Sequence, residues 1–292
     1  AALTVTEPTS NGLGSDAFAL IWSEKDSRLF GLNSSGRAPM LSSIERIKND
    51  FTCADGIMPS HGWAPVTVPG AVKAWAVINE RFGKLSLMDD LSPAVKYASE
   101  GYPCSPNLSK DWKNAYSRYS ALLKGERFDA WFSTFAPEGR GFEAGEMICL
   151  PDHAATLEEI GKTKAESFYS GRIAKLIDEE SKKYGGYLRY EDMASHEAAW
   201  VDPISVNYRG YDVCEIPPNG QGIVALMALN ILKEYEFGEK DSAETCHRQI
   251  EAIKMAFADA FRTVTDPDHM TFDYRNFLKL EYGKIRAAEM TD

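Results

Sequence analysis

Two short runs of strand-forming residues near the start of the chain place the strongest limit on its fold. Residues 17–22 read AFALIW, residues 28–32 read RLFGL, and a polar turn at 23–26 separates them. This pattern predicts an antiparallel hairpin. Because residues 17–21 are apolar without interruption, we expect other layers to cover that strand on both faces. The chain is therefore expected to build a layered fold around a buried sheet.

The remaining patterns are mainly helical, with a few further strands. Apolar residues recur at helical spacing over 41–49, 71–82, 86–99, 106–122, 171–184, 223–232 and 243–262. Strands are expected at 66–69, 200–208 and 211–216, and a strand or turn at 187–190. This mixture predicts an α/β or α+β fold. We expect a single domain over residues 1–292, with the glycine- and phenylalanine-rich stretch 125–150 as a surface excursion.

Composition excludes several classes of function. The chain has 292 residues, of which 44% are hydrophobic and 11% aromatic, as in globular proteins. Its net charge of −11 argues against nucleic acid as a partner, because no basic stripe offsets that field. No stretch approaches the roughly 20 apolar residues of a membrane span. We therefore expect neither nucleic-acid binding nor membrane insertion.

Cysteine and histidine give no sign of a metal site or a disulfide framework. The five cysteines are scattered without a CxxC pair, and the five histidines show no HExxH spacing. We expect no metal and no cofactor. Unpaired cysteines favour a cytoplasmic location over a periplasmic or secreted one. The chain starts at Ala1 without a methionine or a leader pattern, so we expect it to begin inside a longer precursor.

Arg37 is the residue that stands out as a ligand-binding candidate. It follows the small residues Asn33 to Gly36, where the chain leaves the second predicted strand. Side chains at such positions commonly meet ligands, and a guanidinium offers a planar fork of donors suited to a carboxylate. An ordinary surface arginine beside a turn is the alternative, and spacing alone favours it.

Three other motifs have a structural interpretation that we prefer. The glycine loop 12–15 precedes a strand rather than a helix, so we expect close passage of backbone there instead of phosphate binding. The turn 217–222 precedes a helix and is interpreted as a strand-to-helix connection rather than a ligand cradle. Asp266, Asp268 and His269 suit a helix stop better than a metal site. No GxSxG, SxxK or Cys–His signature supplies a catalytic residue in this chain.

Seven stretches in order along the chain resemble the large-subunit region of the γ-glutamyltranspeptidase family, including its cephalosporin-acylase-like branch. They are EPTSNGLGSDAFAL, LNSSGRAP, VPGAVKAWAVINERFGKL, LSPAVKYASEGYPCS, AESFYSGRIAKLI, YEDMASHEAAWVDPISVNYRGYDVCEIPPNGQGIVALMALNIL and FADAFRTVTDPD. The resemblance covers most of residues 7–268, and 125–150 is its least familiar part. No single stretch is decisive, but the series is specific.

The resemblance implies an N-terminal-nucleophile hydrolase, a four-layer αββα sandwich made by autoproteolysis of a precursor. This chain would be the large half, and the small subunit from the same precursor would complete the sandwich. The two would form a heterodimer or a dimer of heterodimers. The family attacks a γ-glutamyl or related acyl amide with the N-terminal threonine of the small subunit. The catalytic nucleophile is therefore expected outside this chain.

One departure from the family bears on the substrate. In the transpeptidases an arginine at the position of Ser35 binds the α-carboxylate of the γ-glutamyl group, whereas this sequence offers Arg37. The resemblance thus implies that Arg37 and Ser35 bind substrate, and that the acyl specificity is either conserved or changed. A cephalosporin (glutaryl) acylase-type hydrolase is the first alternative function. A non-catalytic binding or scaffold homologue is the second.

Overall fold

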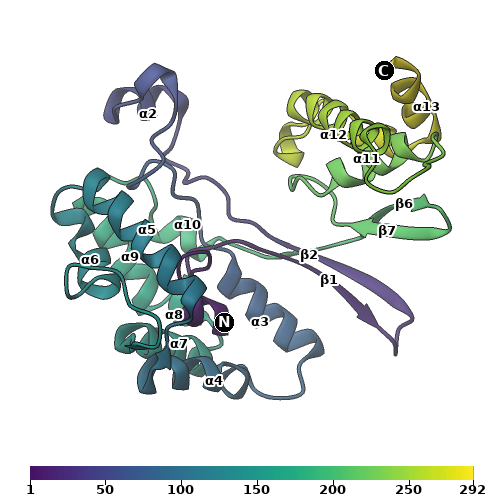
Figure 1. Cartoon of the computed structure of the whole chain (residues 1–292). Helices are drawn as coiled ribbons and strands as arrows, with labels where there is room; N and C mark the ends of the chain where they lie inside the picture. Colours follow the sequence, from purple (N-terminus) through teal and green to yellow (C-terminus); the bar gives the residue numbers. More distant parts are fainter. Residues whose placement is uncertain (292) are drawn as a thin grey trace. The chain divides into compact units, whose positions relative to one another are not determined.

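The computed structural model describes residues 1–291, which divide into two compact units (Figure 1). Unit 1 consists of residues 1–17 and 34–198, and unit 2 of residues 18–33 and 199–292. Each unit is thus assembled from segments that are distant in the sequence. The expectation of a single domain over 1–292 with an excursion at 125–150 stays a prediction.

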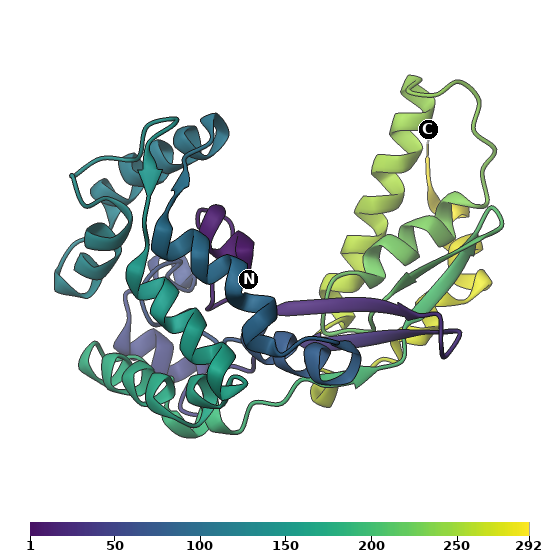
Figure 2. The same ribbon diagram turned by 90° about the horizontal axis from the view of Figure 1, so that it is seen from below.

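Unit 1 is mainly helical. Its helices are α1 (Ala2–Thr6), α2 (Ile44–Asp50), α3 (Ala71–Phe82), α4 (Leu87–Glu100), α5 (Pro106–Leu122), α6 (Asp129–Phe135), α7 (Pro151–Thr163), α8 (Glu166–Tyr169), α9 (Arg172–Lys183) and α10 (Tyr190–Ala194), with 3-10 turns at Ala54–Gly56 (η1) and Glu126–Phe128 (η2). The strands β3 (Tyr102–Pro103) and β4 (Met147–Ile148) form a small antiparallel pair. Helices α4 and α7 pack along each other (Figure 2), and Gly161 allows it, since a Cβ there would lie 2.9 Å from Met88 Cα.

Local sequence chemistry sets where the longer helices begin. Ser86 and Ser105 each accept a hydrogen bond from the backbone N–H three residues later, which caps α4 and α5. Pro106 occupies the first turn of α5, where its missing N–H costs nothing. Gly101 ends α4 with a φ of 90°, a conformation that glycine adopts without strain. These signals explain why the sequence predicts both helices almost to the residue.

Two apolar clusters hold unit 1 together. One lies beneath α3 and includes Val68, Val72 and Phe168, and the other surrounds Trp112 and Leu157. Trp112 is 1% exposed and packs edge-on against Phe142 with ring centroids 4.8 Å apart. Trp112 is therefore part of the core of unit 1.

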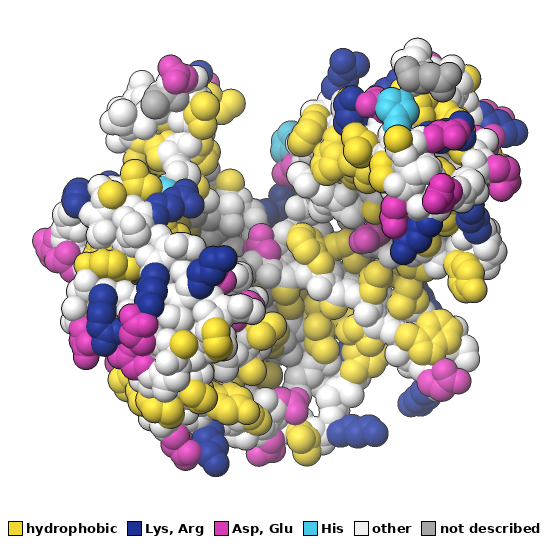
Figure 3. Space-filling model, in the orientation of Figure 1, with side chains coloured by type: hydrophobic (Ala, Val, Ile, Leu, Met, Phe, Trp, Pro, Cys, Tyr) yellow, Lys and Arg dark blue, Asp and Glu magenta, His cyan; other side chains and the backbone are white. Residues whose placement is uncertain are grey.

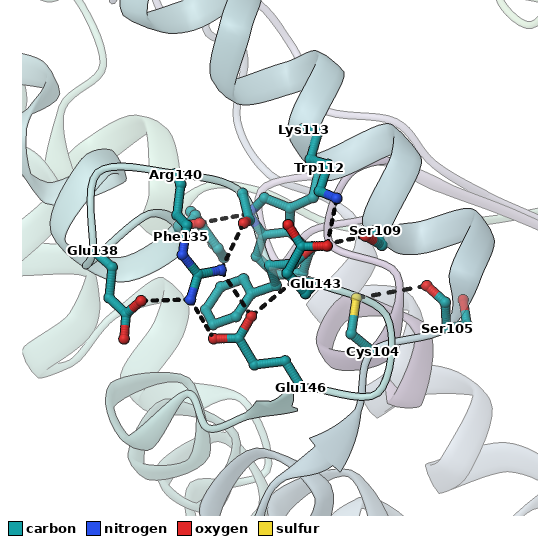
Figure 4. Close-up of polar contacts among 12 residues, drawn as sticks. Cys104, Ser105, Ser109, Trp112, Lys113, Phe135, Glu138, Arg140, Glu143 and Glu146 are labelled. Atoms are coloured by element: carbon teal, nitrogen blue, oxygen red, sulfur yellow. Dashed lines mark hydrogen bonds and ion pairs between the residues drawn. The ribbon is translucent and has the colours of Figure 1, made fainter.

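The stretch 125–150 is tied to α5 by polar contacts (Figure 4). Arg140 Nη1 donates to Glu146 Oε2 at 2.9 Å, and Ser109 Oγ donates to the Phe142 carbonyl at 2.8 Å. Lys113 Nζ and Glu143 Oε2 form an ion pair at 2.6 Å. The Arg140 guanidinium, which bonds to Glu146, lowers the pKa of that carboxyl. Residues 138–146 therefore have a defined course over α5.

Unit 2 combines two small sheets with a helical layer. Its strands are β1 (Ala17–Ser23), β2 (Arg28–Ser34), β5 (Ala199–Val201), β6 (Ile204–Tyr208) and β7 (Tyr211–Glu215). The terminal residues Ala17 and Ser34 of the first two strands belong to unit 1. The helices of unit 2 are α11 (Ile223–Leu232), α12 (Ala243–Thr263) and α13 (Leu280–Glu289), with 3-10 turns at Pro267–His269 (η3) and Tyr274–Leu278 (η4). One sheet has the order β1-β2-β5, with Leu32 opposite Trp200, and β6 pairs with β7. Helix α11 is apolar except for Asn230 and buries eight of its ten residues, mainly against α12 and α13.

The structure corrects the expectation for β1. Its side chains alternate between half-buried and exposed, and Phe18, Leu20 and Trp22 are 48%, 40% and 58% exposed. Hydrophobic side chains gather over the β1–β2 ribbon in the space-filling view (Figure 3). The prediction of cover on both faces is therefore wrong within residues 1–291, where these three side chains stay 40–58% exposed.

Two shorter strand predictions also differ. Residues 66–69 form no strand, because Val68 N–H donates to the Arg37 carbonyl in a single cross-connection and Pro69 has no N–H to continue a ladder. Residues 187–189 are irregular and lead into α10, where Asp192 Oδ2 accepts a hydrogen bond from the Arg189 N–H at 2.8 Å. The other strand and helix predictions are confirmed within a few residues, except that 200–208 splits into β5 and β6.

No helix among residues 1–291 is both long and apolar enough to cross a bilayer. All five cysteines carry free thiols.

Candidate functional site

The segment Ser34 to Arg37, which follows β2, passes extremely close to the segment that leads into α3. A Cβ on Gly36 would lie 1.5 Å from Val68 O, and a Cβ on Gly70 would lie 1.8 Å from Ser34 O. Only glycine therefore fits at either position with the backbone as it stands. This close approach fixes the course of the residues that carry the arginine.

We call the close approach of residues 34–37 to residues 68–70 the crossing. Hydrogen bonds join a third segment, residues 15–16, to it. Asp16 Oδ1 accepts from Gly36 N–H at 2.9 Å. The Ser15 carbonyl accepts from both Gly70 N–H and Ala71 N–H, at 3.1 and 2.8 Å, and so caps the start of α3. Ser15 and Asp16 make these contacts, whereas a Cβ on Gly14 would have no atom within 4 Å and a Cβ on Gly12 none nearer than 3.8 Å. The expectation that the glycines of the loop 12–15 permit close passage of backbone is therefore wrong.

Side chains beneath the crossing reinforce it. Ser34 is fully buried, and its Oγ donates to the Gly70 carbonyl at 2.7 Å. Its Oγ also lies 3.4 Å from Nε2 of His196, which is 7% exposed. The His196 ring stacks on Tyr169 with centroids 5.5 Å apart, and Tyr169 Oη donates to the Pro69 carbonyl at 2.7 Å. Two consecutive carbonyls before α3, those of Pro69 and Gly70, therefore each accept a hydrogen bond from a buried side chain.

Burial and nearby charged groups shift the pKa values of His196 and Tyr169. Lys73 Nζ lies 5.3 Å from the centroid of the Tyr169 ring and 3.3 Å from Glu197 Oε2. Burial lowers the pKa of His196, and Lys73 lowers it further, while Asp16 and Glu197 act in the opposite direction. Burial likewise raises the pKa of the Tyr169 hydroxyl. We conclude that both rings are neutral at pH 7 and act as packed hydrogen-bonding groups.

Asp192 holds the far end of the same segment. Its carboxylate is 4% exposed and accepts from Met40 N–H at 2.9 Å and from Arg189 N–H at 2.8 Å. The turn after Arg37 is thereby joined to α10. The segment from Ser34 to Met40 is consequently fixed at both ends.

Ser35 and Arg37 themselves lie on the outer part of this segment. Ser35 is half-buried, and Arg37 is exposed, with its backbone carbonyl bonded to Val68 N–H at 3.0 Å. The structure thus places both predicted residues on one fixed stretch of backbone. Their role in substrate binding stays a prediction.

Sequence reasoning missed the residues that support this segment: Asp16, Ser34, Tyr169, Asp192 and His196. Their partners are up to 162 residues away in the sequence, so no spacing rule connects them. The informative feature of these residues is that they are polar and buried, and their burial cannot be predicted from a single sequence.

The other motifs behave as structural elements. Residues 217–222 connect β7 to α11, as predicted, and Asn219 Oδ1 accepts from Asn33 Nδ2 at 2.7 Å. Asp266 accepts from Asp268 N–H at 3.0 Å and starts a 3-10 turn, so the turn interpretation is confirmed. Across residues 1–291 no group of three or more His, Cys, Asp or Glu side chains is arranged to hold a metal ion.

A family model described as Gamma-glutamyltranspeptidase matches the whole chain, residues 1–292. The chain belongs to the γ-glutamyltranspeptidase family. Among curated members of this family it is similar to the Glutathione hydrolase-like YwrD proenzyme of Bacillus subtilis (strain 168), with 32% identity over 99% of this chain and 54% of that protein. The chain spans about half the length of the curated relatives it matches.

Solved structures of γ-glutamyltranspeptidase-family proteins show the same fold. The cephalosporin acylase from Bacillus halodurans superposes with a TM-score of 0.94 and 49% identity, over 99% of this chain and 53% of that one. The γ-glutamyltranspeptidase of Helicobacter pylori gives a TM-score of 0.89 at 25% identity, over 99% of this chain and 82% of that one. The α/β, N-terminal-nucleophile hydrolase fold predicted from the sequence is therefore confirmed.

Proposed function

We propose that this chain is the large-subunit part of an amidohydrolase or acyltransferase that cleaves a γ-glutamyl or similar acyl amide. The attacking group is the N-terminal threonine of a small subunit cut from the same precursor, and its own α-amine serves as the base. Membership of the γ-glutamyltranspeptidase family over the full chain supports this assignment. The proenzyme names of relatives that are about twice as long support a partner derived from the same precursor.

One observation carries the contribution of this chain: Arg37 is exposed on a segment whose course is fixed by Gly36, Ser34 and Asp192. A guanidinium on fixed backbone binds a carboxylate with little loss of conformational entropy. We propose that Arg37 binds the acyl carboxylate and that Ser35, two residues earlier, lines the same pocket. A fixed cation there orients an anionic acyl chain before the threonine attacks its amide carbonyl.

The apolar face of β1 supports a partner chain. Phe18, Leu20 and Trp22 expose large side chains on one side of a sheet, an arrangement that is costly in water. We propose that the small subunit covers this face and so completes the four-layer sandwich as a heterodimer. The assembly of two such heterodimers is the alternative oligomeric state.

A cephalosporin (glutaryl) acylase-type activity is the second candidate. It is supported by the 49% identity to the Bacillus halodurans cephalosporin acylase and by the shift of the arginine from position 35 to 37. A γ-glutamyl group carries both a carboxylate and an α-amine, whereas a glutaryl group carries only the carboxylate. A glutaryl pocket therefore needs a cation for the carboxylate but no acidic residue for an amine. The two candidates therefore differ in the acyl donor and not in the bond that is cleaved.

The deciding experiment is expression of the full-length precursor, followed by intact-mass measurement and N-terminal sequencing. We expect two fragments, of which the second starts with threonine. The processed enzyme is then assayed on γ-glutamyl and glutaryl p-nitroanilides, and the larger kcat/KM identifies the acyl class. A precursor that stays in one piece and cleaves neither amide would contradict the proposal and indicate a binding or scaffold protein.

A further inference from the structure

We infer that His196 is a positioning residue for the substrate-binding segment, acting through Ser34 on the placement of Arg37. This inference rests on the proposed role of Arg37 in binding the acyl carboxylate. The imidazole is 7% exposed, and its Nε2 lies 3.4 Å from Ser34 Oγ. Ser34 precedes Arg37 by three residues, so a shift of Ser34 reaches the arginine through the backbone.

The hydrogen-bond directions define which tautomer is present. Ser34 has a single hydroxyl hydrogen, and it is donated to the Gly70 carbonyl at 2.7 Å. The remaining contact of Ser34 Oγ therefore needs a donor, and His196 supplies it from Nε2–H. Burial lowers the pKa of His196, so the neutral imidazole with its proton on Nε2 is the form that fits.

The second neighbour of the imidazole acts on the same stretch of backbone. Tyr169 stacks on His196 with an interplanar angle of 25°. Its Oη donates to the Pro69 carbonyl at 2.7 Å and accepts from Lys73 N–H at 2.8 Å. His196 thus lies between the two side chains that hold the carbonyls of residues 69 and 70.

The crossing above has no space to absorb a shift. Gly36 passes against Val68, and its N–H is bonded to Asp16 Oδ1. Removing the imidazole opens a void beside Ser34 and Tyr169, and the Ser34 backbone can relax toward it. Displacements of about 1 Å at a substrate-positioning group reduce rates strongly. Loss of His196 should therefore weaken binding of an anionic acyl chain through misplacement of Arg37.

The test is a double-mutant cycle in the processed full-length enzyme, with glutaryl p-nitroanilide as the anionic substrate and valeryl p-nitroanilide as the neutral one. We expect His196→Ala to raise KM for the glutaryl substrate about tenfold, with a much smaller change in kcat. In an Arg37→Ala background the same substitution should add almost nothing. His196→Gln, which retains an N–H donor, should recover part of the loss.

His153→Ala is the matched control. His153 is a half-buried imidazole of unit 1 whose pKa is also lowered by burial, but its Nε2 lies 3.2 Å from Thr4 Oγ1 rather than beside Ser34. It should lower thermal stability to a similar extent and leave KM for the glutaryl substrate unchanged. If His196→Ala does not fold, Ser34→Ala takes its place in the cycle, because it removes the same linkage with less loss of volume.

The outcomes separate this inference from the proposed function. If Arg37→Ala raises KM but His196→Ala does not, or if the two effects simply add, the positioning role is overturned and the role of Arg37 stands. If Arg37→Ala itself leaves KM for the glutaryl substrate unchanged, both are overturned. An equal rise for the glutaryl and valeryl substrates would also contradict positioning through a cation.

Discussion

Gly36 and Val68 approach each other so closely that a Cβ on the glycine would stand 1.5 Å from the valine carbonyl oxygen. Gly36 lies between Ser35 and Arg37, the two residues proposed to meet the substrate. The tightest backbone contact of the site is therefore directly beside its proposed functional groups. Any side chain at position 36 must move the segment that carries them.

We predict that Gly36→Ala both destabilises the protein and impairs substrate binding. Overpacking of this kind costs about 1–3 kcal/mol, which corresponds to a decrease in melting temperature of roughly 2–10 °C. Thermal unfolding and KM for an anionic acyl amide are the measurements. Gly14→Ala is the control, because a Cβ there has no atom within 4 Å. Equal stability and equal KM for the two variants would show that the crossing is not rigid.

We predict that Arg37→Ala raises KM for anionic acyl donors by a factor of about 10–100 and affects a neutral amide little, because only the anionic donor loses a charged hydrogen bond. Steady-state kinetics on the processed enzyme measures both. Adding Ser35→Arg to this variant should restore part of the activity on γ-glutamyl substrates, since it places the guanidinium where the transpeptidases carry theirs. Equal losses on anionic and neutral amides would remove Arg37 from the pocket.

We predict that the protein loses stability as the pH falls from 7.5 to 5. The pKa values of His196 and His153 are lowered in the folded protein, so the unfolded chain binds protons first and acidification favours unfolding. For one histidine the slope is at most about 1.4 kcal/mol per pH unit. Urea midpoints measured across this range should fall with decreasing pH.

His196→Gln should make that pH dependence shallower, since it removes one of the two titrating groups. The same replacement at the exposed His247 controls for the effect of a histidine-to-glutamine change at the surface. A slope that His196→Gln does not alter would show that this imidazole is not kept neutral by burial.

We predict that Leu20→Asp lowers the yield of processed, two-chain enzyme from the full-length precursor. A carboxylate on the apolar face of β1 loses its hydration if a partner layer covers that face. Size-exclusion chromatography and intact mass of the product measure this yield. Leu85→Asp is the control, because Leu85 is 61% exposed in a loop of unit 1. Similar yields from both variants would argue that the β1 face stays open to solvent.

The fold was predictable from the sequence wherever local chemistry decides it. Helix α11 is predicted by a run of mainly apolar residues. Helix α12 is predicted by its periodic apolar residues, and Ser242 caps it where that pattern starts. The strand predicted at 66–69 failed because that segment is held by one cross-connection and not by a ladder. The cover over β1 was mispredicted because apolar character shows that a strand needs cover without showing which chain supplies it.

The candidate site was predictable only in its outer part. Arg37 is visible because a cation follows a run of small residues at the end of a strand. The buried contacts beneath it, between Ser34 and His196, join residues 162 apart and arise from packing. The resemblance to a known family identified the segment, but the geometry was needed to show that its backbone is fixed.

The pairing of β2 with β5 has a consequence for biosynthesis. Arg28 and Asp202, which flank that pairing and form an ion pair at 2.5 Å, are 174 residues apart in the sequence. At a translation rate of about 5–20 residues per second, roughly 9 to 35 s separate their emergence from the ribosome. During that interval the N-terminal hairpin has an unpaired edge and an apolar side, which are the features that recruit chaperones or lead to aggregation. Slower translation before residue 199 should therefore reduce the yield of soluble protein.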